Sequence, residues 1–160
     1  MKPSNSNSKT GEITCHTPEE TFDLGTRLSR DLCAGDVVLL SGELGAGKTL
    51  LTKGILHGLG YDVDEVTSPS FTLVNLYKAA EINVYHIDLW RLDCETDAAA
   101  GVGLDEILED PSAIAIIEWP DRLSAVPDAK RVIAVSIAGD GDDPRKIKID
   151  FPFRSVTGDS

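Results

Sequence analysis

Basic residues are scarce in this sequence. The 160 residues include 15 Lys and Arg against 27 Asp and Glu, which gives a formal net charge of −12. No basic stripe of the kind that a nucleic-acid footprint requires is visible. We therefore expect nucleic acid to be reached only through a partner that supplies positive charge. The acidic excess instead favours docking on a basic protein surface.

Cysteine is also rare. Cys15, Cys33 and Cys94 are far apart and odd in number, and no Cys-x-x-Cys pair occurs. This spacing argues against a disulfide framework and against a zinc site. Because free cysteines persist in reducing compartments, we expect a cytoplasmic protein.

Long apolar runs are absent as well. No stretch approaches the roughly 18 residues that a transmembrane helix needs. The polar residues 1–11 lack the apolar centre of a secretory signal peptide. We expect no contact with a membrane and a disordered tail at 1–11. A single domain over residues 12–152 should follow, with a flexible tail at 153–160, since this length suffices for one hydrophobic core.

The most informative stretch is residues 42–49, which fit the P-loop pattern G-x-x-x-x-G-K-[ST] at every fixed position. It consists of Gly42, Glu43, Leu44, Gly45, Ala46, Gly47, Lys48 and Thr49, after an apolar run at 36–41 and before a helical pattern at 50–59. Such a loop meets phosphate with backbone N–H groups and a helix N-terminus. We expect ATP or ADP here, with Lys48 at the β- and γ-phosphates and the Thr49 hydroxyl on Mg²⁺.

The remaining pattern alternates strands with helices. Expected strands span 12–16, 36–41, 71–77, 82–89, 113–118, 132–137 and 146–151, and expected helices begin at 18, 50 and 96. The first helix has Thr17 as its N-cap and Gly35 after its end. The run at 113–118 is almost continuously apolar, as in a strand covered on both faces. These elements predict an α/β fold: a three-layer, P-loop NTPase-like domain with a mixed, mostly parallel central sheet and antiparallel additions.

Two acidic residues close apolar strands. Asp88 ends the run 84–88, which is the Walker B arrangement for holding Mg²⁺. Glu118 ends the run 114–118 and either ligates the metal or orients the attacking water as general base; the sequence does not rank these roles. For each acid a purely structural role, such as capping a turn, stays open. His86 is interpreted as a structural histidine.

Between the P-loop helix and the next expected strand lies a hydroxyl-rich loop. Thr67, Ser68 and Ser70 would be suitable donors in a switch loop that senses the γ-phosphate. Taken alone, the segment reads more simply as an ordinary Ser-Pro turn.

These segments together resemble a known family. Residues 42–49 and 67–71, the string Tyr85-His86-Ile87-Asp88-Leu89-Trp90-Arg91-Leu92, and Ile117-Glu118-Trp119-Pro120 occur in this order. In this combination the chain resembles the TsaE (YjeE) family, the small bacterial P-loop ATPases of tRNA threonylcarbamoyladenosine biosynthesis. The resemblance covers about residues 17–151. It implies a single α/β domain that uses ATP with Mg²⁺.

The resemblance also implies partners and roles. The partners are TsaD and TsaB, whose assembly transfers threonylcarbamoyl to the adenosine beside the tRNA anticodon, and ATP hydrolysis resets that assembly between turnovers. Carried over to this chain, residues 44–49 cradle the phosphates, Thr49 and Asp88 serve the metal, and Glu118 lies at the metal and the attacking water. The expected catalytic residues are Glu118, Lys48 and Asp88. Further expected nucleotide contacts are Leu50, Thr17, Thr67, Ser68, Ser70, Trp119 and Arg145, the last near the adenine.

Two other functions stay open at this point. A P-loop kinase for a small metabolite would use the same phosphate loop, but kinases usually need a basic lid, and no Lys/Arg-rich helix follows the switch region. A nucleotide-binding module without turnover is the second alternative.

Overall fold

A seven-stranded mixed sheet forms the centre of the molecule. The structure is a computed structural model that describes residues 9–43, 45–66, 73–78, 81–92 and 98–151. Its strands are β1 (Lys9–Cys15), β2 (Asp36–Gly42), β3 (Val74–Lys78), β4 (Asn83–Asp88), β5 (Ala113–Glu118), β6 (Arg131–Ala138) and β7 (Arg145–Phe151). Their order is β1-β7-β6-β2-β5-β4-β3. The central strands β6, β2, β5 and β4 are parallel, and β1, β7 and β3 add antiparallel pairings at the two sides.

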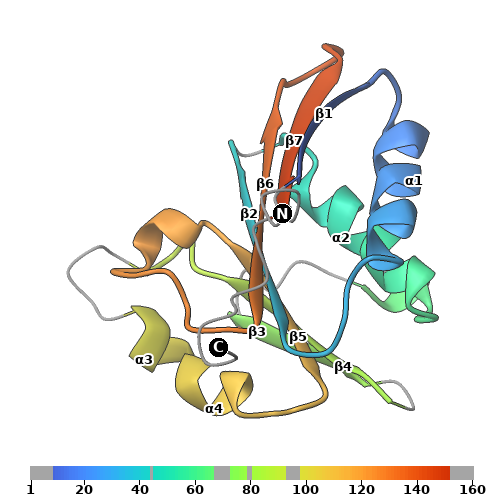
Figure 1. The fold of residues 1–160 in the computed structure, drawn as a ribbon. Helices are drawn as coiled ribbons and strands as arrows, with labels where there is room; N and C mark the ends of the chain where they lie inside the picture. Colours follow the sequence, from blue (N-terminus) through green and yellow to red (C-terminus); the bar gives the residue numbers. More distant parts are fainter. Residues whose placement is uncertain (1–8, 44, 67–72, 79–80, 93–97, 152–160) are drawn as a thin grey trace, which may run out of the picture.

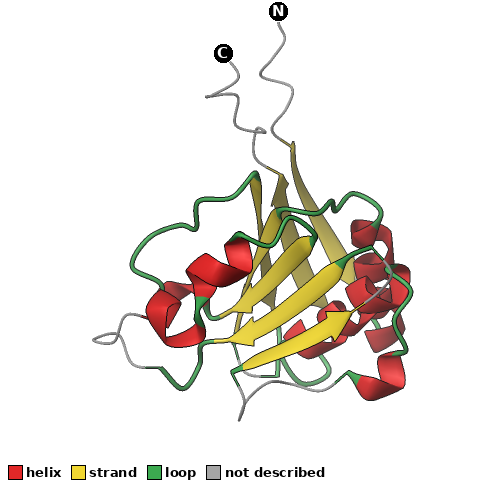
Figure 2. Ribbon diagram, turned by 90° about the horizontal axis from the view of Figure 1, so that it is seen from below, coloured by secondary structure: helices red, strands yellow, loops and turns green. Residues whose placement is uncertain are grey.

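Helices cover both faces of this sheet. The helices α1 (Pro18–Ser29) and α2 (Lys48–Gly58) lie on one face, and the short helices α3 (Ala98–Val102) and α4 (Leu104–Leu108) lie on the other (Figure 1). Figure 2 shows the same layers with the sheet between them. Two 3₁₀ turns, η2 (Val63–Glu65) and η3 (Pro120–Arg122), complete the described elements. The expected three-layer α/β fold is confirmed.

Alternation along the central strands divides the core in two. Val38, Leu40, Ile114 and Ile116 pack in the cluster under α1 and α2, whereas their neighbours, such as Ile117, pack in the cluster under α3 and α4. Because successive side chains of a strand point to opposite faces, both faces of β5 are buried. This burial explains its continuous apolar sequence.

The pair α1–α2 packs with its backbones unusually close. A Cβ at Gly54 of α2 would overlap the carbonyl oxygen of Phe22, and a Cβ at Gly25 of α1 would overlap that of Leu51. The Thr26 hydroxyl of α1 also donates to the Gly54 carbonyl at 3.1 Å. Small residues at this crossing therefore set the position of α2, whose N-terminus carries the P-loop.

The first helix, α1, begins where the sequence predicted, but it ends several residues before the predicted end. Thr17 caps α1 by accepting from the Glu20 N–H at 3.1 Å, with Pro18 at the first helical position. The helix ends at Ser29 with Arg30 as C-cap. The expectation that Gly35 follows the helix directly is therefore wrong. Gly35 instead opens the entry to β2, where its φ of 97° suits glycine.

Three other elements differ from the expected ones by more than a shift of one or two residues at an end. β1 begins at Lys9, inside the segment 1–11 that was expected to be a tail. β3 begins at Val74, and residues 71 and 72 of the expected strand lie outside the described residues. The expected single helix over 96–108 is broken into α3 and α4 at Gly103, which has a φ of 69°. None of the helices among the described residues combines the length and apolar character needed to cross a bilayer.

Candidate functional site

The P-loop connects the carboxyl end of β2 to the N-terminus of α2. Gly47 is the N-cap of α2 with a φ of 112°, and Gly45 has a φ of 83°. L-residues with a Cβ rarely adopt these angles, so the glycines permit the tight curl. At Gly42 a Cβ would meet the Ile137 carbonyl oxygen at 2.9 Å. Leu44 lies outside the described residues.

Lys48 projects across this loop. Its Nζ donates to the carbonyl oxygens of Gly42 at 2.5 Å and Glu43 at 3.0 Å. It also lies 4.6 Å from the ring centroid of Trp119, within cation–π distance. Burial lowers the pKa of Lys48, and the charges of Glu118, Asp88 and Glu43 oppose that shift. A buried ammonium that faces two carboxylates without an ion pair to them is suited to receive an anion.

Asp88 and Glu118 end adjacent parallel strands. They are register partners in the β4–β5 pair, so their side chains project from the same face of the sheet. Both are buried, with 5% and 3% of their surface exposed. Asp88 accepts a hydrogen bond from the Trp90 N–H at 2.9 Å. Burial raises the pKa of Asp88, and the Trp90 N–H opposes this shift.

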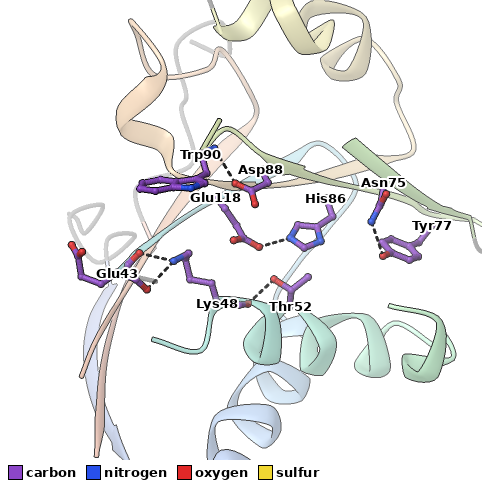
Figure 3. A network of polar contacts seen from close by, with 10 residues as sticks. Glu43, Lys48, Thr52, Asn75, Tyr77, His86, Asp88, Trp90 and Glu118 are labelled. Atoms are coloured by element: carbon purple, nitrogen blue, oxygen red, sulfur yellow. Dashed lines mark hydrogen bonds and ion pairs between the residues drawn. The ribbon is translucent and has the colours of Figure 1, made fainter. Parts of the chain in front are cut away.

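A cavity of about 420 Å³ joins these groups. It is lined by Gly45, Gly47, Lys48, Thr49, Leu50, Lys53, Asp88, Trp90, Glu118 and Trp119. The expected phosphate, metal and catalytic side chains thus surround one space at the carboxyl ends of the parallel strands, the usual ligand position in open α/β sheets. Figure 3 shows Lys48 below and Asp88, Glu118 and Trp90 above this space.

A second cavity adjoins the first. It measures about 200 Å³ and is lined by Cys15, His16, Thr17, Pro18, Thr21, Ala46, Gly47, Leu50, Gly141, Asp142, Asp143 and Arg145. Gly47 and Leu50 belong to both cavities. The two expected residues Thr17 and Arg145, distant in sequence, meet here. The two cavities therefore lie side by side, one lined by the P-loop lysine and the two strand-end acids and the other by Thr17 and Arg145.

Arg145 has a role that the sequence did not indicate. Its Nε donates to the Ala46 carbonyl at 2.9 Å, and its Nη2 donates to those of Gly45 at 3.3 Å and Gly141 at 3.2 Å. The guanidinium thus ties the P-loop to the β6–β7 turn. It thereby satisfies the carbonyl oxygens of Gly45 and Ala46 in the P-loop.

Trp119 has an uncommon backbone. Its φ of 61° lies in the left-handed region, where a non-glycine residue carries strain of about 1–3 kcal/mol. The following Pro120 disfavours the right-handed helical region at this position. The Trp119 ring stacks on Trp90 with centroids 4.3 Å apart. Arg122 lies 5.5 Å from the Trp90 ring, so an aromatic wall closes one side of the phosphate cavity.

A contact of a candidate site residue that sequence reasoning missed is the one between His86 and Glu118. Nε2 of His86 lies 2.5 Å from Glu118 Oε2, and the histidine side chain is fully buried. The sequence could have indicated this contact, because His86 lies two residues before Asp88 and therefore on the same face of β4. Thr67, Ser68 and Ser70, the expected switch loop, lie outside the described residues, and their roles stay predictions.

A larger cavity of about 570 Å³ lies at the other end of the sheet. Asp36 and Ala113, which begin β2 and β5, line it together with Ile107, Asp110 and Lys130. It contains none of the P-loop residues, so volume alone does not mark the site.

The fold and these cavities define the class: an α/β domain with a P-loop NTPase-like fold and a candidate phosphate site at the end of its parallel strands. The model of the family described as "Threonylcarbamoyl adenosine biosynthesis protein TsaE" matches residues 15–147. The chain therefore belongs to the TsaE family, which places it in tRNA threonylcarbamoyladenosine biosynthesis.

Individual relatives agree with this assignment. The chain is similar to the tRNA threonylcarbamoyladenosine biosynthesis protein TsaE of Nostoc sp., with 34% identity over 88% of this chain and 85% of the relative. It is 40% identical to the Mycobacterium bovis protein of that name over 71% of each chain. It is also similar to the crystal structure of Bacillus subtilis YdiB, with a TM-score of 0.67 and 30% identity over 90% of this chain and 86% of that one.

Proposed function

We propose that this chain binds ATP with Mg²⁺ in the cytoplasm and hydrolyses it, acting on the TsaD–TsaB assembly to reset it between rounds of tRNA modification. The observation that carries this proposal is the single cavity lined by Lys48, Thr49, Asp88 and Glu118. These residues supply a cation, a hydroxyl and two carboxylates. Together they are the donor set expected for a nucleoside triphosphate and its metal.

The residues present fit the proposed ligands. Gly45 and Gly47 have positive φ angles and no side chains, so the backbone of the loop can approach phosphates closely at these positions. Lys48 offers a buried positive charge. Thr49 and Asp88 would hold Mg²⁺, which prefers hard oxygen ligands and keeps several waters. When bound, Mg²⁺ would supply positive charge against the charge that develops on the phosphate oxygens.

Glu118 is the proposed general base. It is buried at the end of β5 on the cavity wall, where it would accept a proton from the attacking water. Lys48 would offset charge on the transferred phosphoryl group. The second cavity, with Thr17 and Arg145 in its lining, is the proposed space for adenosine.

A phosphate-release assay tests the proposal. Purified chain is incubated with ATP and Mg²⁺, with and without TsaD–TsaB, and inorganic phosphate is measured over time. We expect slow release alone and faster release with the partners. A metabolite kinase would instead transfer phosphate to an added acceptor, and a binding module would release none under either condition. Either outcome would overturn the proposed hydrolysis.

A further inference from the structure

We propose that His86 is the positioning residue of Glu118: it holds the Glu118 carboxylate in the orientation that proton abstraction requires. This inference rests on the proposed function, because it concerns the base of the proposed hydrolysis. It departs from the interpretation of His86 as a structural histidine of the sheet.

The contact joins two adjacent strands inside the protein. His86 lies on β4 and Glu118 on β5, with Nε2 2.5 Å from Oε2. Exposed fractions are 0% for the imidazole and 4% for the carboxylate side chain. In Figure 3 the imidazole points along the sheet toward Glu118, and Lys48 approaches from the α2 side. Water therefore does not compete for this hydrogen bond.

The hydrogen bond fixes one oxygen and leaves the other. In the proposed role Nε2 carries the hydrogen of this contact and donates it to Oε2, because a general base must be an ionised carboxylate, which only accepts hydrogen bonds. Oε1 is not part of this contact, and Glu118 lines the cavity. Charge-assisted hydrogen bonds of this kind are short and directional. A glutamate has three side-chain torsions, and the bond to Oε2 reduces the number of arrangements that they can adopt.

The second ring nitrogen of His86, Nδ1, also bears on the role of the imidazole. Among the described residues, Nδ1 of His86 is the one buried side-chain nitrogen or oxygen without a hydrogen-bond partner. A histidine with only a structural role in the core would be expected to form hydrogen bonds through both ring nitrogens. Here the hydrogen bond that is present is the one between Nε2 and Glu118. Among the described residues, the hydrogen bond of the imidazole is therefore the one to the carboxylate of Glu118.

The contact between His86 and Glu118 predicts a loss of hydrolysis rate when His86 is replaced. Misplacing a catalytic group by about 1 Å can cost on the order of 100-fold in rate. His86→Asn removes the donor at Nε2 but keeps a small polar side chain. His86→Gln places an amide nitrogen near the position of Nε2 and should retain the contact. We expect His86→Asn to slow single-turnover hydrolysis with TsaD–TsaB by about 10- to 100-fold and His86→Gln to restore most of that loss.

Three further measurements separate positioning from a structural role. Calorimetric affinity for ATP–Mg²⁺ should change less than about twofold in His86→Asn, because the contact with Glu118 is not a ligand contact. Thermal unfolding identifies any variant that has lost its fold. In a Glu118→Gln background, His86→Asn should cause no additional loss of rate, since the two residues act as one unit.

Proton NMR of the ligand-free protein tests the contact without activity. The sequence contains three histidines, so His16→Gln and His57→Gln variants assign the imidazole signals. The Nε2 proton of His86 should be shifted downfield and protected from exchange, and Glu118→Gln should move it. The positioning role is overturned if the wild type hydrolyses ATP and His86→Asn does so at the same rate. It is also overturned if the signal of the His86 Nε2 proton does not move in Glu118→Gln. Absence of hydrolysis in the wild type overturns the proposed function and the role of His86 with it.

Discussion

Lys48 provides the charge that the phosphate cavity needs most. A charge-assisted contact contributes about 1.5–3 kcal/mol, so Lys48→Ala should weaken ATP–Mg²⁺ binding by roughly 10- to 100-fold. Titration calorimetry measures this loss, and circular dichroism should show an intact fold. Lys53→Ala is the matched control on the same helix, since Lys53 lines the cavity but has no hydrogen bond to the P-loop among the described residues. An unchanged affinity in Lys48→Ala would contradict its role.

Thr49 and Asp88 belong to one proposed metal site. Mg²⁺ demands near-octahedral oxygen ligation, so losing either oxygen should reduce the enhancement of ATP binding by Mg²⁺. Thr49→Ala and Asp88→Asn should each reduce it, and the double variant should be less than additive because both act on one ion. Calorimetry with and without Mg²⁺ measures the four proteins. Strictly additive effects would show that Asp88 serves the turn at Trp90 instead.

Trp119 should report nucleotide binding. Its ring lies over Lys48 and lines the phosphate cavity, so bound phosphate would change its surroundings. The fluorescence of Trp90, which stacks on Trp119, would overlap with that of Trp119. We expect a change in indole fluorescence when ATP–Mg²⁺ is added to Trp90→Phe, and none in a variant that also carries Trp119→Phe. A constant signal in Trp90→Phe would place Trp119 away from the ligand.

The candidate site residues that lie close together in the sequence could be proposed from local patterns. The P-loop has eight consecutive residues, and each acid directly ends an apolar run. The contact between His86 and Glu118 joins residues 32 apart, and that of Arg145 with Ala46 joins residues 99 apart. Both depend on strand register, which a single sequence does not specify.

Among the elements, the crossing of α1 and α2 determines where the P-loop lies. Gly54→Ala would place a methyl group against the Phe22 carbonyl, and such overpacking costs about 1–3 kcal/mol. Because α2 must shift, we expect both a lower free energy of unfolding and weaker ATP binding. Urea denaturation and calorimetry measure the two effects.

Gly101→Ala is the matched helical control. The nearest atom to its Cβ would be Leu92 Cδ1 at 3.7 Å, an ordinary contact. Alanine is favoured over glycine in helices by about 1 kcal/mol, so stability should be equal or higher. Gly54→Ala with wild-type stability would show that the crossing tolerates a wider spacing.

The central strands and their mostly parallel arrangement could be predicted because buried parallel strands have distinctive apolar runs, whereas the spatial order of the strands was not predicted. The break at Gly103 could not be predicted either, since an isolated glycine is tolerated inside helices and tertiary packing decides its conformation. β1 was expected too short for another reason. Residues 9–11 are polar or glycine, and pairing with β7 rather than hydrophobic pattern extends the strand.

For the molecule as a whole, the proposed stimulation of hydrolysis by TsaD–TsaB leads to a prediction about charge. No arginine lines the phosphate cavity within the described residues, and Arg145 is committed to P-loop and turn carbonyls. In other phosphoryl-transfer systems an arginine supplied in trans contributes about 10³–10⁵ in rate. The net charge of −12 favours docking on a basic surface. Association should then weaken with salt, because exposed charges are screened beyond about 8–10 Å at 0.1–0.15 M.

Glu118→Gln should separate partner binding from hydrolysis. The amide keeps nearly the same shape and can still contact His86, but it cannot accept the proton of the attacking water. We therefore expect the variant to retain ATP and to remain bound to TsaD–TsaB, whereas the wild type hydrolyses ATP and dissociates. Single-turnover hydrolysis at saturating partner, followed by size-exclusion chromatography of the complex, measures both steps. A wild-type rate equal to that of the isolated chain would eliminate stimulation in trans, and a fully active Glu118→Gln would eliminate Glu118 as the base.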